Sequence, residues 1–133
     1  FMHGGGRGQF FTVPLNLAKR GNLAQHLVSG QWSQIAVKEA AKYMQSEVVA
    51  ENFTEDGKIC VPEQSSWKIN QQAAYFHYYP NETVEAIEIN WVPKTGDVPL
   101  VADMSSNILS KAINIADYGI IYAGAQKILD PLD

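Results

Sequence analysis

Short apolar runs of strand type alternate along this chain with segments of helical spacing, and this alternation constrains the fold most. Strand-like runs occupy 23–30 (LAQHLVSG), 98–106 (VPLVADMSS) and 118–127 (YGIIYAGAQK), and residues 32–47 have helical spacing. The run PLVAD is almost continuously apolar, as a strand buried on both faces of a parallel sheet requires. The sequence therefore predicts an α/β fold with a mainly parallel sheet and flanking helices.

The size and charge of the chain limit the classes of protein to which it can belong. Its 133 residues, 46% hydrophobic and 18% charged, suit a single globular domain over 1–133. A net charge of -4 with scattered basic residues argues against a nucleic-acid surface. Cys60 is the single cysteine, which excludes an intrachain disulfide, and no apolar run reaches the roughly 20 residues that span a bilayer. A cytoplasmic protein is the default expectation.

A glycine run, HGGGRGQ at 3–9, opens a segment that reads as a helix ending at Gly21-Asn22. Unpaired N–H groups at such a helix start, with the positive end of its dipole, suit a phosphate. The run lacks the Lys-Ser/Thr ending of a nucleotide-binding P-loop and the spacing of a dinucleotide fingerprint. A purely structural glycine turn is the alternative. Pro14 should limit how early the helix begins.

Asp103 and Lys127 each follow an apolar strand, so they are expected at the same edge of a parallel sheet. A carboxylate that ends a buried strand is costly unless a cationic or hydrogen-bonding partner meets it. A lysine that forms a Schiff base with an aldehyde, together with a carboxylate on a pyridinium nitrogen, is the pairing that pyridoxal phosphate uses. The alternative for Asp103 is a helix N-cap in DMSSNIL at 103–109.

Other candidate residues have two interpretations each. Trp32 is either a stacking partner for a planar ring or a core aromatic, and Thr83 either donates to a ring hydroxyl or caps a turn. His3, His26 and His77 have no ligand-like spacing, so a metal site is not expected, and His77 should be a packed residue. The polar stretch 54–70 should form loops or short strands.

Several segments together resemble the phosphoserine aminotransferase family, whose members are class-V, fold-type-I pyridoxal-phosphate enzymes. The resemblance rests on HGGGRGQF, VPLN, SGQWS, KEAAKY, AAYFHYYPNET, WVP, VADMSSNILS and YGIIYAGAQK, which follow the family's order through nearly the whole chain. It implies that 1–133 is part of the large, cofactor-binding domain and that the family's small C-terminal domain is absent. Another class-V enzyme such as a desulfurase is disfavoured, because its nucleophilic cysteine would lie outside this chain.

The resemblance also implies which residues bind pyridoxal 5'-phosphate. They are Gly6 and Arg7 at the phosphate, Trp32 stacked on the ring, Thr83 at the ring hydroxyl, Asp103 at the ring nitrogen, Gln126 at the phosphate and Lys127 as the lysine that carries the cofactor. The implied reaction is ping-pong transamination between phosphoserine or glutamate and 3-phosphohydroxypyruvate or 2-oxoglutarate, with Lys127 moving the α-proton. The implied setting is a cytoplasmic homodimer in serine biosynthesis, with a related step toward pyridoxine.

After Lys127 the sequence departs from the family, which continues with Asn and a Gly-Pro-Ala-Gly segment where this chain has ILDPLD at 128–133. The family-like continuation Lys-Asn-Leu-Gly-Pro-Ala-Gly-Leu can be back-translated, with codons that we chose, as AAA AAT CTT GGA CCC GCT GGA CTG A. Deleting one A from its run of A gives Lys-Ile-Leu-Asp-Pro-Leu-Asp-stop, which is the end of this chain, so a frameshift is our hypothesis. Sequencing the coding DNA tests it. The isolated chain is expected to be inactive, and the alternative is a non-catalytic fragment that at most binds cofactor or pairs with a full-length subunit.

Overall fold

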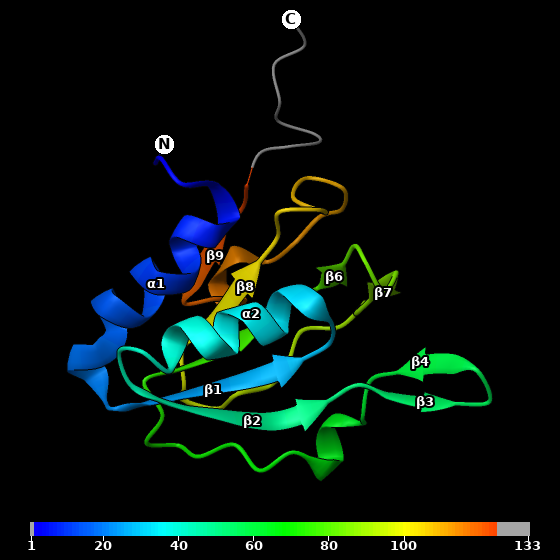
Figure 1. Ribbon diagram of the computed structural model, residues 1–133, viewed down its shortest axis with the longest axis horizontal. Coiled ribbons are helices and arrows are strands. Elements are labelled where there is room, and N and C mark those ends of the chain that lie inside the picture. The colour runs from blue at the N-terminus through cyan, green and yellow to red at the C-terminus, as the bar shows by residue number, and fades with distance from the viewer. Residues whose placement is uncertain (1, 125–133) are drawn as a thin grey trace, which may run out of the picture.

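Five parallel strands form the sheet at the centre of the computed structural model, which describes residues 2–124 (Figure 1). Their order in the sheet is β2-β1-β5-β8-β9, and every neighbouring pair is parallel. The strands are β1 (Leu23–Val28), β2 (Gln45–Glu51), β5 (Tyr75–Tyr78), β8 (Leu100–Asp103) and β9 (Ile120–Tyr122). The predicted α/β fold with a mainly parallel sheet is confirmed.

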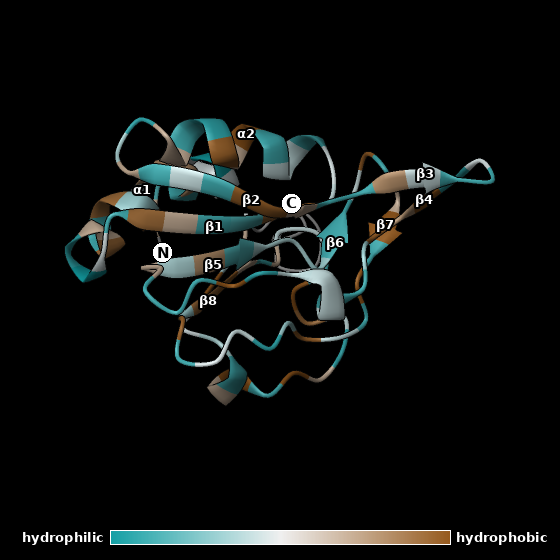
Figure 2. Cartoon of the chain, turned by 90° about the horizontal axis from the view of Figure 1, so that it is seen from below, coloured by the Kyte–Doolittle hydropathy of each residue, from teal (hydrophilic) through white to brown (hydrophobic). Residues whose placement is uncertain are grey.

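Two helices cover one face of this sheet. They are α1 (Gly5–Leu17), which continues into the 3-10 turn η1 (Ala18–Arg20), and α2 (Gln31–Ala40). Phe10 and Val13 from α1 and Ala36 from α2 pack in one buried cluster with Tyr75 and Val101 of the sheet. Irregular segments, including the 3-10 turn η2 (Gln64–Ser66), cover the other face (Figure 2).

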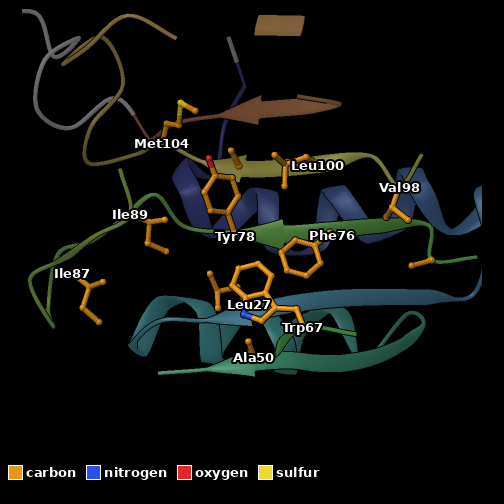
Figure 3. Close-up of a cluster of buried hydrophobic side chains, with 12 residues drawn as sticks. Leu27, Ala50, Trp67, Phe76, Tyr78, Ile87, Ile89, Val98, Leu100 and Met104 are labelled. Carbon is orange, nitrogen blue, oxygen red and sulfur yellow. The ribbon is translucent and has the colours of Figure 1, made fainter. Parts of the chain in front are cut away.

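The central strand β5 contributes side chains to the cores on both faces of the sheet, since successive side chains of a strand point in opposite directions. Tyr75 belongs to the cluster under the helices, whereas Phe76 and Tyr78 belong to the cluster on the other face (Figure 3). In that second cluster the rings of Trp67 and Phe76 stack, with centroids 5.6 Å apart and planes 15° apart. All four residues of β5 are buried, which explains its strongly aromatic sequence.

Two short hairpins branch from the sheet. β3 (Phe53–Glu55) pairs with β4 (Lys58–Cys60), and β6 (Asn81–Glu82) pairs with β7 (Ile87–Glu88). The first of them projects away from the sheet in Figure 1 and accounts for the short strands expected in 54–70. The second follows β5 directly and carries Thr83, so its position decides where that residue lies.

Local boundaries differ from the sequence predictions in three places. Pro14 lies inside α1, which begins at Gly5, so the proline does not delay the helix. Helix α2 ends at Ala40 and β2 already begins at Gln45, because β2 pairs with β1 from its first residue. Residues 105–109 form turns, not a helix, so the N-cap alternative for Asp103 is wrong. The described crossover from β8 to β9 contains one short element, the 3-10 turn η3 (Ile115–Asp117), and no α-helix.

Within residues 2–124 the structure contains no helix long and apolar enough to cross a bilayer. The same described part holds no group of three or more metal-ligating side chains. Cys60 is half-buried at the end of β4 and is a free thiol.

Two buried histidines make the fold sensitive to acid. His26 is fully buried, with no hydrogen-bond partner on either ring nitrogen, and burial lowers its pKa to about 3. The pKa of buried His77 is also lowered, first by burial and then by His26. Because each folded-state pKa lies below the unfolded value of 6.5, the neutral ring contributes stability above pH 6.5 that is lost as pH falls.

We therefore expect His26→Phe to reduce the acid sensitivity of the fold. Between pH 7 and pH 5 the wild-type chain should lose about 2 kcal/mol more unfolding free energy than the variant, which lacks this titrating group. Urea denaturation at the two pH values measures the difference. His3→Gln, at an exposed position, serves as the control and should keep the wild-type loss. Equal losses in the wild type and His26→Phe would contradict the assignment.

Candidate functional site

The carboxyl ends of the parallel strands meet at one edge of the sheet, where the structure has a cavity of about 270 Å³. Its lining combines the first residues of α1 and α2 with residues that follow β5, β8 and β9. Five of the seven predicted site residues line it: Gly6, Arg7, Trp32, Thr83 and Asp103. Gln126 and Lys127 lie outside the described residues.

The glycine run forms the turn that begins α1. Gly4 has a left-handed backbone with φ of 102°, and its carbonyl accepts the N–H of Gly8 at 2.9 Å. The first N–H groups of an α-helix have no partner within the helix, so those of this turn can bind an anion. A Cβ atom on Gly6 would lie 3.1 Å from the hydroxyl oxygen of Ser105, so the close approach of these segments favours glycine.

Arg7 connects α1 with α2 across the cavity. Its guanidinium carbon lies 5.5 Å from the ring centroid of Trp32, within cation–π range. Trp32 itself packs partly against the cluster under the helices and also lines the cavity, so both sequence interpretations of this residue are compatible with its place. The site thus offers a positive charge and an aromatic face side by side.

Asp103 ends β8 and is only 7% exposed. Its Oδ1 accepts the backbone N–H of Ser105 at 2.9 Å and also the Ser105 hydroxyl. Burial raises the pKa of Asp103, while hydrogen bonds from Ser105 and Tyr122 act in the opposite direction. A buried carboxylate of this kind favours a ligand that brings a cationic donor to it.

Ser105 also reaches the end of β9. Its hydroxyl oxygen accepts the N–H of Gly124 at 2.8 Å while the same hydroxyl donates to Asp103. Gly124 is the last described residue before the segment that holds Gln126 and Lys127. The turn after β8 and Gly124, two residues after β9, are therefore fixed to one another beside the Asp103 carboxylate.

A buried aromatic layer lies next to Asp103. Tyr122 is its partner in the register between β8 and β9, and the Tyr122 hydroxyl hydrogen-bonds Nε2 of His77 at 2.9 Å. His77 is 2% exposed, and its ring stacks on that of Tyr79, a residue of the cavity lining, with centroids 5.0 Å apart. The prediction that His77 is a packed residue is confirmed.

Thr83 lies in the β6–β7 hairpin, whose first strand is fixed to the turn after β8. The side-chain amide of Asn81 donates to the hydroxyl oxygen of Ser106 at 2.7 Å, and that hydroxyl donates to the Asn81 carbonyl at 2.9 Å. Thr83 is exposed and is one of the residues that line the cavity. Asp103 and Thr83 therefore belong to segments that are connected directly.

Sequence reasoning missed several residues of this site. Ser105 and Gly124 join the carboxylate to the end of β9, and Glu82 lines the cavity from β6. The sequence Asp-Met-Ser carries a signal for Ser105, since an Asp side chain commonly accepts the N–H two residues later. Glu82 had no local signal, because its partners lie in α2, far away in the sequence.

The arrangement has a defined chemical capacity. Unpaired N–H groups and Arg7 can bind an anionic group, Trp32 offers an aromatic face, and Asp103 can accept a hydrogen bond from a protonated ring nitrogen. Such a set of groups suits a planar, nitrogen-containing ring that carries an anionic arm.

Comparisons with known proteins agree with this arrangement. A model of the family described as aminotransferase class-V matches residues 1–132. Phosphoserine aminotransferase from Pseudomonas syringae pv. syringae (strain B728a) is 47% identical over 131 residues, which cover 98% of this chain and 36% of the relative. The corresponding protein of Hahella chejuensis (strain KCTC 2396) is 46% identical over the same shares. The chain thus spans about a third of the length of these curated relatives.

Solved structures are similar in fold. Phosphoserine aminotransferase from Bacillus circulans subsp. alkalophilus matches with a TM-score of 0.86 and 37% identity over 93% of this chain and 34% of that one. PLP-bound phosphoserine aminotransferase from Trichomonas vaginalis matches with a TM-score of 0.80 and 34% identity, over 90% of this chain and 36% of that one. The described fold is therefore part of the phosphoserine aminotransferase fold.

Proposed function

This chain belongs to the class-V aminotransferase family, and we therefore propose that it binds pyridoxal 5'-phosphate as part of a phosphoserine:2-oxoglutarate aminotransferase. The observation that carries the proposal is the buried Asp103 carboxylate, which lies in one cavity with the glycine turn and Arg7. Burying a carboxylate at the end of an apolar strand costs free energy and adds nothing to the packing of the sheet. The same carboxylate stabilises a protonated ring nitrogen that is bound beside it.

The residues present fit this cofactor. The amides at Gly6 and Arg7 would hold its phosphate, Trp32 would stack on the ring, Thr83 would donate to the ring hydroxyl and Asp103 would meet the ring nitrogen. Gln126 would add a phosphate contact. When bound, the cofactor supplies an electron sink for the substrate carbon that loses its proton.

Two residues of the protein would then control protons: one would transfer the α-proton, and the other would keep the ring nitrogen protonated. Lys127 would bind the cofactor covalently through its amine and, once released by substrate, would take the α-proton and return it. Asp103 would keep the ring nitrogen protonated, since its carboxylate is held in place by Ser105. Lys127 as catalytic residue remains a prediction, because it lies outside the described part of the chain.

The substrates, the pathway, the oligomeric state and the cellular location are proposals that concern the longer proteins to which this chain is similar. Phosphoserine, glutamate, 3-phosphohydroxypyruvate and 2-oxoglutarate are the proposed substrates and products, in serine biosynthesis with a related step toward pyridoxine. A homodimer in the cytoplasm is the proposed setting. A chain of one third of the relatives' length that only binds cofactor, or pairs with a full-length subunit, is the second candidate.

Reductive capture of the cofactor tests the proposal. The purified 133-residue chain is incubated with pyridoxal 5'-phosphate, reduced with borohydride, digested and analysed by mass spectrometry. We expect one dominant pyridoxyl group, in the peptide that contains Lys127, and less capture when inorganic phosphate competes for the glycine turn. Labelling spread evenly over surface lysines, at the level seen with urea-denatured chain, would overturn the proposal.

A further inference from the structure

Two glutamates from the β6–β7 hairpin bind the N-terminus of α2 from a distant part of the sequence. Oε1 of Glu82 accepts the backbone N–H of Ser33 at 3.0 Å, and Oε1 of Glu85 accepts that of Gln31 at 2.9 Å. Trp32 lies between the two donating residues, and Thr83 lies between the two glutamates. The contact therefore joins the two segments that carry these cavity residues.

The local cap of α2 leaves these N–H groups available. The Ser33 hydroxyl oxygen accepts the N–H groups of Ser29 and Gly30, each at 2.9 Å, and the hydroxyl donates to the Gly30 carbonyl at 2.7 Å. Gly30 occupies the N-cap position and has no side chain to accept an N–H from the first turn. The two carboxylates act in its place, and their negative charge is favourable at the positive end of the helix dipole.

Gly30 provides the space that the carboxylates occupy. A Cβ atom at this position would lie 2.6 Å from Cδ of Glu85 and 2.9 Å from Cδ of Glu82, so any side chain would displace them. Its φ of 176° is an extended conformation open to every residue. The requirement for glycine here is consequently one of space and not of backbone strain.

Capping alone does not account for this arrangement. Glu82 is 1% exposed, and its Oε2 has no hydrogen-bond partner. Burial raises the pKa of Glu82, hydrogen bonds from Ser33 and the Trp32 backbone lower it, and Glu85 raises it. A serine at position 30 would supply an acceptor for the helix start without burying a carboxylate, which is costly.

We propose that Glu82, assisted by Glu85, is a positioning residue that fixes Trp32 and Thr83 relative to each other across the cavity. The hairpin is fixed on its other side by Asn81 and Ser106, so Glu82 completes its attachment between α2 and the turn after β8. The relevance for ligand binding rests on the proposed function, in which Trp32 and Thr83 contact the cofactor. The fixing itself does not depend on that function.

The test follows Trp32 directly. The chain is labelled with 5-fluorotryptophan, and its three fluorine resonances are assigned with the variants Trp32→Phe, Trp67→Phe and Trp91→Phe. We expect Glu82→Ala to shift or broaden the Trp32 resonance and to leave that of Trp67, in the cluster on the other sheet face, unchanged. Glu82→Gln retains an acceptor oxygen and should preserve the wild-type resonance.

Cofactor affinity supplies the second readout. Glu82→Ala should raise the dissociation constant of pyridoxal 5'-phosphate about tenfold, whereas Glu82→Gln should stay within about threefold of wild type. If Glu82→Ala does not fold, Glu85→Ala and Gly30→Ala replace it, since one removes an acceptor and the other displaces both carboxylates. They should move the same resonance.

The outcomes separate this proposal from the proposed function. Wild-type chain that fails to bind pyridoxal 5'-phosphate would reject the function, yet the Trp32 resonance would still report whether Glu82 fixes it. An unaltered Trp32 resonance in Glu82→Ala, or in both replacement variants, would refute the positioning role. Equal perturbation by Glu82→Gln and Glu82→Ala would also refute it, because the acceptor geometry would then be irrelevant.

Discussion

Replacing Lys127 by alanine should abolish the specific borohydride-fixed attachment of pyridoxal 5'-phosphate. The reason is positional: Lys127 follows Gly124 by three residues in the sequence, and Ser105 holds Gly124 beside Asp103. None of the lysines within residues 2–124 lines the cavity, so none of those can substitute for Lys127. Capture in the variant should fall to the level of the urea-denatured chain, as measured by mass spectrometry of the intact protein.

Lys111→Ala is the matched control for this experiment. Lys111 is a surface lysine that pairs with Glu88 at 3.0 Å, away from the cavity lining, and its loss should leave the capture intact. Reversible binding should survive in Lys127→Ala, since the glycine turn and Arg7 remain, and equilibrium dialysis measures it. Undiminished capture in Lys127→Ala would show that another amine is the reactive one.

Much of the fold could be predicted because its signals are local. The apolar runs that form β1, β8 and β9 are strongly patterned, and parallel pairing of such strands needs no detailed knowledge of their partners. Boundaries were harder to predict. Helix α2 was predicted to extend to residue 47, but β2 begins at Gln45, because pairing with β1 outweighs helical spacing at the end of the segment.

The candidate site likewise contains residues that local sequence signals predict and contacts that they do not. Gly6, Arg7, Trp32, Thr83 and Asp103 were predicted from motifs and line one cavity, since each follows a strand or starts a helix at the same sheet edge. Their roles toward a cofactor remain predictions.

The supporting contacts were not predictable from the sequence. Glu82 meets α2, Ser105 meets Gly124, and His77 meets Tyr122, all through side chains whose partners are distant along the chain. No periodicity or motif specifies such pairs, because they depend on how the strands are ordered in the sheet. The strand order itself, with β5 between β1 and β8, came only from the structure.

The second large effect is expected in the core that supports this edge. Phe76 is fully buried in β5, the middle strand, and stacks on Trp67 on the face opposite the helices. Phe76→Ala should lower the free energy of unfolding by about 3–5 kcal/mol, through lost burial and the cavity that remains. Because a domain has only about 5–15 kcal/mol of stability, this loss is large, and urea denaturation measures it.

Phe53→Ala is the matched control, as Phe53 is 45% exposed in β3 and should cost less than about 1 kcal/mol. Phe76→Leu keeps most of the apolar volume and should lose less than about 2 kcal/mol. Comparable losses in Phe76→Ala and Phe53→Ala would show that β5 is not the centre of the core. Asp103 is the last residue of β8, and β8 pairs with β5 through Phe76 and Leu100. Phe76→Ala should therefore also weaken binding of pyridoxal 5'-phosphate, even though Phe76 is not among the residues that line the cavity. That weakening should disappear when binding is corrected for the fraction of unfolded chain, because Phe76 supports the sheet edge and takes no part in ligand contacts.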